Sequence, residues 1–252
     1  MIQLKELTLG YGQQILLDKV SAQIANGQLV ALLGRNGTGK STLLRALMGL
    51  ERPIHGNIYI QQRSVHSLRA EELAQNVSLV TTERIRIPHL SCKDVVALGR
   101  APYTNWIGRL QPADNRQIEE AMKLTGMLSY ADKTMDRMSD GECQRIMIAR
   151  ALAQDTPVIL LDEPTAFLDL PNRYELCLLL KKLAKEKKKS IIFSTHDLDI
   201  ALSLCDFLLL IDNPQLYALP TQEMINGRHI ERLFRNETVT FDAQAMKVKV
   251  RS

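Results

Sequence analysis

A glycine-rich run, GRNGTGKST, has the composition of a loop that wraps around phosphate groups. It matches the pattern G-x-x-x-x-G-K-[ST] and comprises Gly34, Arg35, Asn36, Gly37, Thr38, Gly39, Lys40, Ser41 and Thr42. Glycines let successive backbone N–H groups turn inward around a β-phosphate, and the start of the following helix adds a positive end. Lys40 is expected on the β- and γ-phosphates and the Ser41 hydroxyl on Mg²⁺. The loop predicts a nucleoside triphosphate site.

Two carboxylates follow an apolar run at residues 158–161. Asp162, at the end of a buried strand, suits the magnesium shell beside the phosphate loop. Glu163 is expected to face a water in line with the γ-phosphate, as general base or orienting group. An Asp-Glu pair after a strand more often caps a helix, but its pairing with the phosphate loop favours the catalytic interpretation. His196, after an apolar run at 190–194, is placed to donate a hydrogen bond to the γ-phosphate.

The elements before the phosphate loop are predicted to be strands. Residues 2–9 form the first, ended by a turn at 10–12, and residues 20–24 form the second. The Asn26-Gly27 pair then predicts a hairpin-type turn into residues 28–33. This last run is apolar throughout, as in a strand buried on both faces, and an amphipathic helix at 41–50 follows the loop.

The middle of the chain is predicted to be helical, and strands alternate with helices again after it. A capping box at Ser91 and starts at Pro112 and Ser139 indicate the helices. The alternation implies a parallel sheet covered on both sides, hence an α/β fold. We expect one domain: a core over about 1–86 and 155–213, an inserted helical subdomain over about 87–154 and a short extension over 214–252.

Composition excludes several classes of protein. The chain has 252 residues, 45% of them hydrophobic and 24% charged, which excludes disorder and low complexity. No uncharged apolar run approaches the roughly 18–20 residues of a spanning helix, and the N-terminus has no pattern of a secretory signal. A net charge of +4 with only 5% aromatic residues argues weakly for nucleic acid. The four cysteines form no C-x-x-C pair, so neither a disulfide framework nor a zinc site is expected.

Three further segments give these motifs a family resemblance. MSDGECQ at 138–144 resembles the signature segment of ATP-binding-cassette (ABC) ATPases, DEPTAFLD at 162–169 their Walker B and D-loop, and STHD at 194–197 their switch histidine. Tyr11 matches the aromatic that stacks on adenine in that family. The ALGRAP and WIGRL segments between 97 and 110 are similar to the ATPase subunits of iron-chelate (siderophore), haem and cobalamin importers. The fold implied by the resemblance is that of the ABC nucleotide-binding domain, an α/β P-loop NTPase with a parallel-sheet core, an N-terminal antiparallel β part and an inserted helical subdomain.

The signature and the Q-loop depart from the family pattern. Ser139 and Gly141, whose amides bind the γ-phosphate from the opposite subunit in the family, are retained, but Asp140 and Glu142 add carboxylates. Each like charge at about 6 Å would cost roughly 2–3 kcal/mol at an effective dielectric constant near 20, so we expect both to face outward.

The Q-loop glutamine of the family falls on Thr82, with Glu83 beside it. Either residue can reach the metal, and Glu83 is the candidate that would add a charged magnesium ligand.

The resemblance also implies partners. In the family the signature is too far from its own phosphate loop to complete one site, so a head-to-tail homodimer binding ATP and Mg²⁺ is expected. Two integral-membrane permease subunits and, indirectly, a substrate-binding protein would complete an importer, with this chain peripheral on the cytoplasmic face of the inner membrane and no nucleic acid bound.

Two other classes of function compete with the importer. A soluble ABC ATPase acting on nucleic acid or the ribosome usually carries two cassettes or a long coiled coil, whereas here Asp162 follows Lys40 by only 122 positions (162 − 40). A phosphotransferase kinase would leave residues 139–144 without a role.

Overall fold

The computed structural model describes residues 1–12, 14–81, 89–234, 239–243, 245 and 247–250. Its strands are β1 (Ile2–Tyr11), β2 (Gln14–Ile24), β3 (Leu29–Gly34), β4 (His55–Ile60), β5 (Arg63–Ser64), β6 (Val77–Val80), β7 (Val158–Leu161), β8 (Ser190–Ser194), β9 (Phe207–Asp212), β10 (Gln215–Pro220), β11 (Val239–Asp242) and β12 (Lys247–Val250). Its α-helices are α1 (Lys40–Leu47), α2 (Ala70–Ala74), α3 (Cys92–Ala97), α4 (Pro112–Leu124), α5 (Asp140–Ala153), α6 (Leu170–Glu186), α7 (Leu198–Leu204) and α8 (Thr221–Asn226). Short 3₁₀ turns are η1 (Val65–Ser67), η2 (Leu98–Tyr103), η3 (Leu128–Tyr130), η4 (Met135–Arg137) and η5 (His229–Leu233).

The central sheet has the strand order β10-β9-β3-β8-β7-β6. All its neighbours pair in parallel except β9 and β10, which are antiparallel. Every residue of β3, β7 and β8 is buried, as expected for strands covered on both faces. The parallel order aligns the carboxyl ends of β3, β8 and β7, so the loops that follow these strands start at one edge of the sheet.

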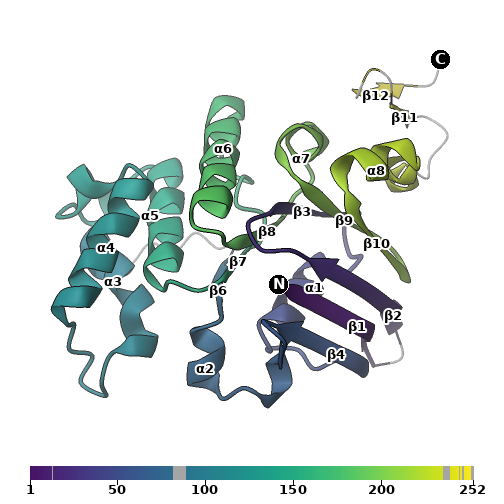
Figure 1. Cartoon of the computed structure of the whole chain (residues 1–252). Helices are drawn as coiled ribbons and strands as arrows, with labels where there is room; N and C mark the ends of the chain where they lie inside the picture. The colour runs from purple at the N-terminus through teal and green to yellow at the C-terminus, as the bar shows by residue number, and fades with distance from the viewer. Residues whose placement is uncertain (13, 82–88, 235–238, 244, 246, 251–252) are drawn as a thin grey trace.

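A second, antiparallel sheet lies beside the first, with the order β2-β1-β4-β5 (Figure 1). Here the sequence-based expectation of a hairpin at Asn26-Gly27 is wrong: β2 pairs with β1, whereas β3 pairs with β8 and β9. The turn therefore carries the chain from one sheet to the other. The strand expected at 2–9 continues to Tyr11, and the strand expected at 20–24 begins at Gln14, because the two form a long ladder.

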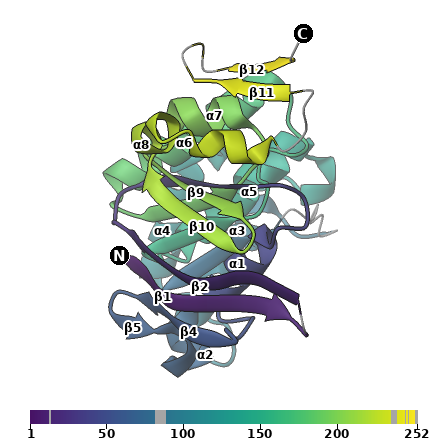
Figure 2. The ribbon, with the colours of Figure 1, turned by 90° about the vertical axis from the view of Figure 1, so that its right-hand side faces the viewer.

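The helices of the middle segment pack on one another at one end of the molecule, left in Figure 1. Ser91 caps α3 through the predicted capping box, and α5 begins after Ser139 as expected, where the structure shows a second capping box. The helix expected at 41–50 is shorter, because α1 ends at Leu47 and Gly49 takes a left-handed φ of +70°. In Figure 2 the paired strands β11 and β12 lie at the end of the molecule that carries the C-terminus.

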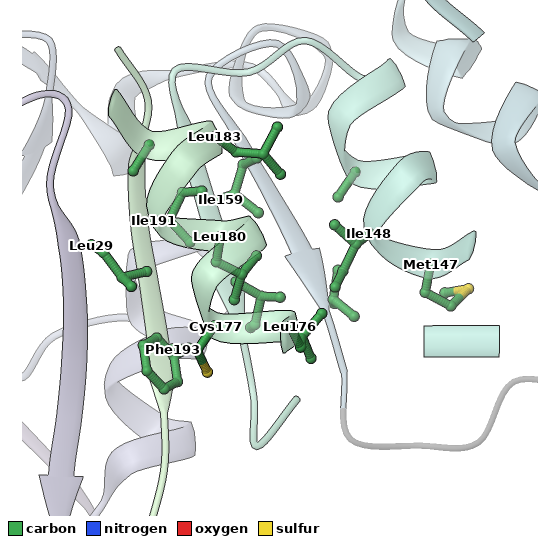
Figure 3. Packing of buried hydrophobic residues seen from close by; sticks show 14 of the residues in the cluster. Leu29, Met147, Ile148, Ile159, Leu176, Cys177, Leu180, Leu183, Ile191 and Phe193 are labelled. Atoms are coloured by element: carbon green, nitrogen blue, oxygen red, sulfur yellow. The ribbon is translucent and has the colours of Figure 1, made fainter. Parts of the chain in front are cut away.

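Two apolar clusters cover the two faces of the central sheet. Alternate residues of β3 divide between them: Leu29, Ala31 and Leu33 join the cluster on the α6 side, whereas Val30 and Leu32 join the cluster with α1 and the antiparallel sheet. Figure 3 shows the first cluster, in which one face of α6 packs on the strands; its labelled residues include Leu29, Ile159, Leu176, Cys177, Leu180, Leu183, Ile191 and Phe193. Strand β3, which leads into the phosphate loop, is therefore held by apolar packing on both of its faces.

A buried ion pair holds the helical segment together. Arg100 in η2 is 7% exposed and Asp114 at the start of α4 is 4% exposed, and Arg100 Nε donates to Asp114 Oδ1 at 2.8 Å. Arg100 also donates to the carbonyl of Ala153 at the end of α5 (2.8 Å), and the N–H of Gln111 donates to Asp114 (2.8 Å). One cation therefore joins η2, α4 and α5.

Asp114→Ala is expected to lower the free energy of unfolding by about 3–5 kcal/mol, because it leaves the Arg100 guanidinium buried without its anion. Urea unfolding measures this loss. Glu119→Ala removes an exposed carboxylate of the same helix, paired with Lys123, and should have little effect. Equal losses in the two variants would contradict the role of the buried pair.

The same pair predicts a pH dependence. The hydrogen bond from the Gln111 N–H lowers the pKa of Asp114. Burial acts in the opposite direction, and the Arg100 guanidinium lowers the pKa further. A carboxyl group whose pKa is lower in the folded state stabilises the fold above its unfolded pKa of about 3.9 and loses that contribution as the pH falls further. The free energy of unfolding, measured from pH 6 to pH 3, should therefore fall at the acid end of this range. The fall should be smaller in Asp114→Asn, which lacks the titrating carboxyl group.

Candidate functional site

The phosphate loop connects β3 to α1. Gly37 and Gly39 have φ values of +77° and +101°, which glycine adopts without strain. The Lys40 side chain is 7% exposed, and its Nζ donates to the carbonyls of Gly34 (3.0 Å) and Arg35 (3.3 Å). Burial lowers the pKa of the Lys40 ammonium, and the carboxylates of Glu163 and Asp162 oppose this shift. Lys40 is therefore buried near the predicted general base, Glu163, and the predicted magnesium ligand, Asp162.

The ends of β7 and β8 are joined through one hydroxyl group. Ser194 Oγ donates to Asp162 Oδ1 at 2.6 Å and accepts from the N–H of Glu163 at 2.8 Å. Glu163 has a φ of +45°, in the left-handed region that is uncommon for residues with a Cβ. The Ser194 hydroxyl thus holds the Asp162 carboxylate and the unusual backbone of Glu163 together. Sequence patterns alone give Ser194 no role at the site.

His196 and Glu163 lie in contact. His196 Nε2 is 2.9 Å from Glu163 Oε1, and both residues line a small cavity with Thr165, Arg173 and Asp197. The imidazole can therefore orient the carboxylate that the sequence predicts to act on water.

Tyr11, at the end of β1, lies next to the phosphate loop. Its hydroxyl is 3.1 Å from Thr42 Oγ1 and donates to Glu51 Oε1 at 3.4 Å. Its side chain is half exposed. These contacts place an accessible ring beside the first turn of α1, which also carries the exposed Ser41.

The expectation that Asp140 and Glu142 face outward is wrong for Glu142. The Ser139 N–H and hydroxyl both donate to Glu142 Oε2 at 2.8 Å, because the two residues form the capping box of α5. These hydrogen bonds lower the pKa of Glu142. Asp140 is half-buried and, with Ser139, Gly141 and Glu142, lines a cavity of about 380 Å³. The N-terminal end of α5 favours negative charge, and its capping box binds the Glu142 carboxylate. These two local interactions, which the estimate of charge repulsion left out, set the orientation of Glu142.

The predicted site residues fall into two groups. Lys40, Asp162, Glu163 and His196 gather at the carboxyl ends of β3, β7 and β8. The other walls of the cavity at Ser139 are Arg145 and residues from the segment 167–176, and among the described residues none of the phosphate loop lines it. Thr82 and Glu83, the Q-loop candidates, lie outside the described residues. Within those residues, no helix is both long and apolar enough to span a membrane.

Comparison with known proteins matches this geometry to one family. The family model described as ABC transporter matches residues 17–166. An uncharacterised ABC transporter ATP-binding protein of Methanocaldococcus jannaschii is 39% identical over 230 residues, which cover 91% of this chain and 79% of that protein. The petrobactin import ATP-binding protein of Bacillus anthracis is 33% identical over 237 residues, covering 94% of this chain and 87% of that protein.

Two solved structures agree with the fold. A metal-chelate-type ABC transporter in an inward-facing conformation gives a TM-score of 0.82 at 26% identity, covering 98% of this chain and 95% of that chain. A dimeric ATP-binding cassette bound to ADP and Pi after hydrolysis gives a TM-score of 0.73 at 28% identity, covering 88% of this chain and 99% of that chain.

The fold and the site define an ATP-binding-cassette ATPase, which confirms the α/β P-loop architecture expected from the sequence. The chain belongs to the ABC transporter family, as an ATP-binding ATPase subunit similar to those of iron-chelate importers.

Ser194→Ala is expected to lower the kcat of ATP hydrolysis about ten-fold, because it removes two hydrogen bonds that position Asp162 and Glu163. The control is Ser190→Ala, which removes a hydroxyl from the other end of β8, where it donates to the carbonyl of Ala25. Phosphate release and thermal unfolding are measured for both. If both variants lose activity in proportion to their loss of stability, Ser194 has no specific role at the site.

Proposed function

We propose that this chain is the ATP-hydrolysing subunit of a membrane importer and works as a head-to-tail pair of identical subunits. The observation that carries the proposal is the division of the nucleotide machinery: phosphate loop, Glu163 and His196 in one place, Ser139 in another. A two-fold related copy would present its own Ser139 to the loop of the first, and each copy would complete the other's site. The dimeric cassette with ADP and Pi supports this arrangement by analogy.

Each residue of the loop and strand edge then has a role toward ATP. The N–H groups of the phosphate loop surround the phosphates, and Lys40 moves from the carbonyls of Gly34 and Arg35 to the β- and γ-phosphates. The Ser41 hydroxyl and the Asp162 carboxylate are oxygen donors that fit Mg²⁺, which when bound neutralises phosphate charge. The Tyr11 ring stacks on adenine.

Glu163 accepts the proton of the attacking water as general base. The contact of its Oε1 with His196 Nε2 holds the carboxylate in position, and donation from that Nε2 to the γ-phosphate requires that this contact opens. At the partner's signature, the γ-phosphate would compete with Glu142 for the N–H and hydroxyl of Ser139. Because only the triphosphate reaches both subunits, ATP closes the pair and hydrolysis lets it open.

The helical segment supplies the surface for a membrane partner. Trp106 is 94% exposed and Ile107 is 68% exposed, side by side in a turn in which Asn105 Oδ1 accepts from the N–H groups of Ile107 and Arg109. Two large apolar side chains held outward support docking of two permease subunits on a pair of these chains. The chain would then lie peripherally on the cytoplasmic face of the inner membrane. The petrobactin relative and the metal-chelate transporter favour an iron-siderophore cargo, with haem and cobalamin complexes as further candidates.

Glu163→Gln should retain ATP binding, abolish steady-state hydrolysis and accumulate a dimer with ATP, because the amide keeps the shape of the side chain but is no base. Light scattering after gel filtration measures the dimer, and phosphate release measures turnover. Glu186→Gln, at the end of α6, is the control and should behave as wild type. Hydrolysis at the wild-type rate by Glu163→Gln would remove Glu163 from the role of base.

Purification of the tagged chain from detergent-solubilised native membranes tests the importer itself. A multi-spanning protein recovered at equal stoichiometry is the expected result, and its genomic neighbours would indicate the cargo. Recovery of ribosomes or nucleic acid in its place would instead support an ABC ATPase acting on those partners and would overturn the importer.

A further inference from the structure

The turn between β9 and β10 reaches the phosphate loop through one amide side chain. Asn213 Nδ2 donates to the carbonyl of Leu16 in β2 at 2.7 Å and to the carbonyl of Thr38 in the loop at 3.0 Å. Both acceptors are carbonyl oxygens, which cannot donate, so the amide nitrogen must face them and both of its hydrogens are used. Asn213 therefore bridges three segments that are far apart in the sequence.

The bond to Thr38 fixes the direction of a phosphate-binding N–H. The Thr38 carbonyl and the Gly39 N–H belong to one peptide unit, and in a planar trans unit they point in opposite directions. When Asn213 holds the carbonyl, the Gly39 N–H is turned away from the β9–β10 turn. Gly39 has a φ of +101°, a conformation open to glycine, whose flexibility leaves this peptide free to rotate unless a neighbour restrains it.

The other end of the bridge is anchored in the sheet. The Asp18 N–H of β2 donates to the carbonyl of Pro214 at 2.9 Å, next to the Asn213 bond with Leu16. The Leu16 side chain is buried, and a Cβ on Gly39 would lie only 3.1 Å from its Cδ1. Strand β2 and the β9–β10 turn thus form a fixed support directly against the loop.

We propose that Asn213 is a positioning residue for phosphate binding, which orients the Thr38–Gly39 peptide so that its N–H faces the nucleotide. The inference rests on the proposed nucleotide site. A loop N–H held in place before the ligand arrives does not have to be ordered on binding, so the binding free energy is not reduced by that cost. Asn213 contacts neither the reacting atoms nor the catalytic carboxylates through these bonds, so its effect should fall on affinity rather than on turnover.

Calorimetric titration of the purified chain with ADP and Mg²⁺ tests the proposal. Asn213→Ala should raise the Kd about 5- to 10-fold, the effect of about one hydrogen bond. Asn213→Ser keeps one possible donor and should lie between Ala and wild type. Asn213→Asp places a carboxylate against two carbonyls and should bind most weakly at pH 8. For ATP hydrolysis, KM should rise similarly while kcat stays within about two-fold of wild type.

Gln215→Ala, which removes an exposed amide two positions further on in β10, is the matched control and should bind as wild type. Thermal unfolding without nucleotide separates a structural role from positioning. A lower melting temperature with unchanged Kd in Asn213→Ala, or in Asn213→Ser if the first variant does not fold, would overturn the proposal. Failure of the wild-type chain to bind ADP would instead overturn the proposed nucleotide site.

Discussion

The parallel order of β3, β8 and β7 is the constraint on which the rest of the structure depends. Residues far apart in the sequence become neighbours only because these strands end at one edge. The 2.6 Å bond from Ser194 to Asp162 joins two of the strand ends, and burial of Lys40 near Asp162 and Glu163 joins the third. Apolar side chains on both faces of the strands supply the free energy that keeps this edge in register, so the charged groups need not attract one another to assemble.

Local patterns predicted much of this arrangement. The phosphate loop, the buried strands, the capping box at Ser91 and the helix start at Ser139 depend on residues within a few positions of one another, and the structure contains each of them. The Asn26-Gly27 turn was misread because such a turn has the same sequence whether the strands beside it pair or not. Pairing of β2 with β1 is decided by the whole ladder, which a short window does not contain.

Two side chains of the site escaped prediction for a related reason. Ser194 bonds to Glu163 across 31 positions, and Asn213 bonds to Thr38 across 175. Ser194 begins the STHD segment, whose pattern points to His196 and gives the serine no role, and Asn213 stands in no motif, since an asparagine before a proline is ordinary turn chemistry. Their roles come from the partners that folding brings to them. Glu142 differs from these two residues, because a local pattern, the capping box with Ser139, is sufficient to predict its position. The estimate of charge repulsion from phosphate predicted the wrong orientation.

The two places where phosphate would bind already hold groups of the protein. Lys40 donates to two loop carbonyls, and Ser139 gives both of its donors to the Glu142 carboxylate. In the proposed function, nucleotide binding would therefore exchange one set of hydrogen bonds for another, and its net free energy would be the difference between the two sets. The hydrogen bonds from Ser139 to the Glu142 carboxylate are charge-assisted, so a ligand that displaces the carboxylate must be a comparably strong acceptor, as a phosphate group is. In the proposed head-to-tail pair, ADP would occupy the loop without reaching the other subunit, whereas the γ-phosphate of ATP would compete at both places. In that proposal, the difference between the affinities of the two ligands for open and closed pairs, and not the affinity of either ligand alone, would let hydrolysis shift the equilibrium between them.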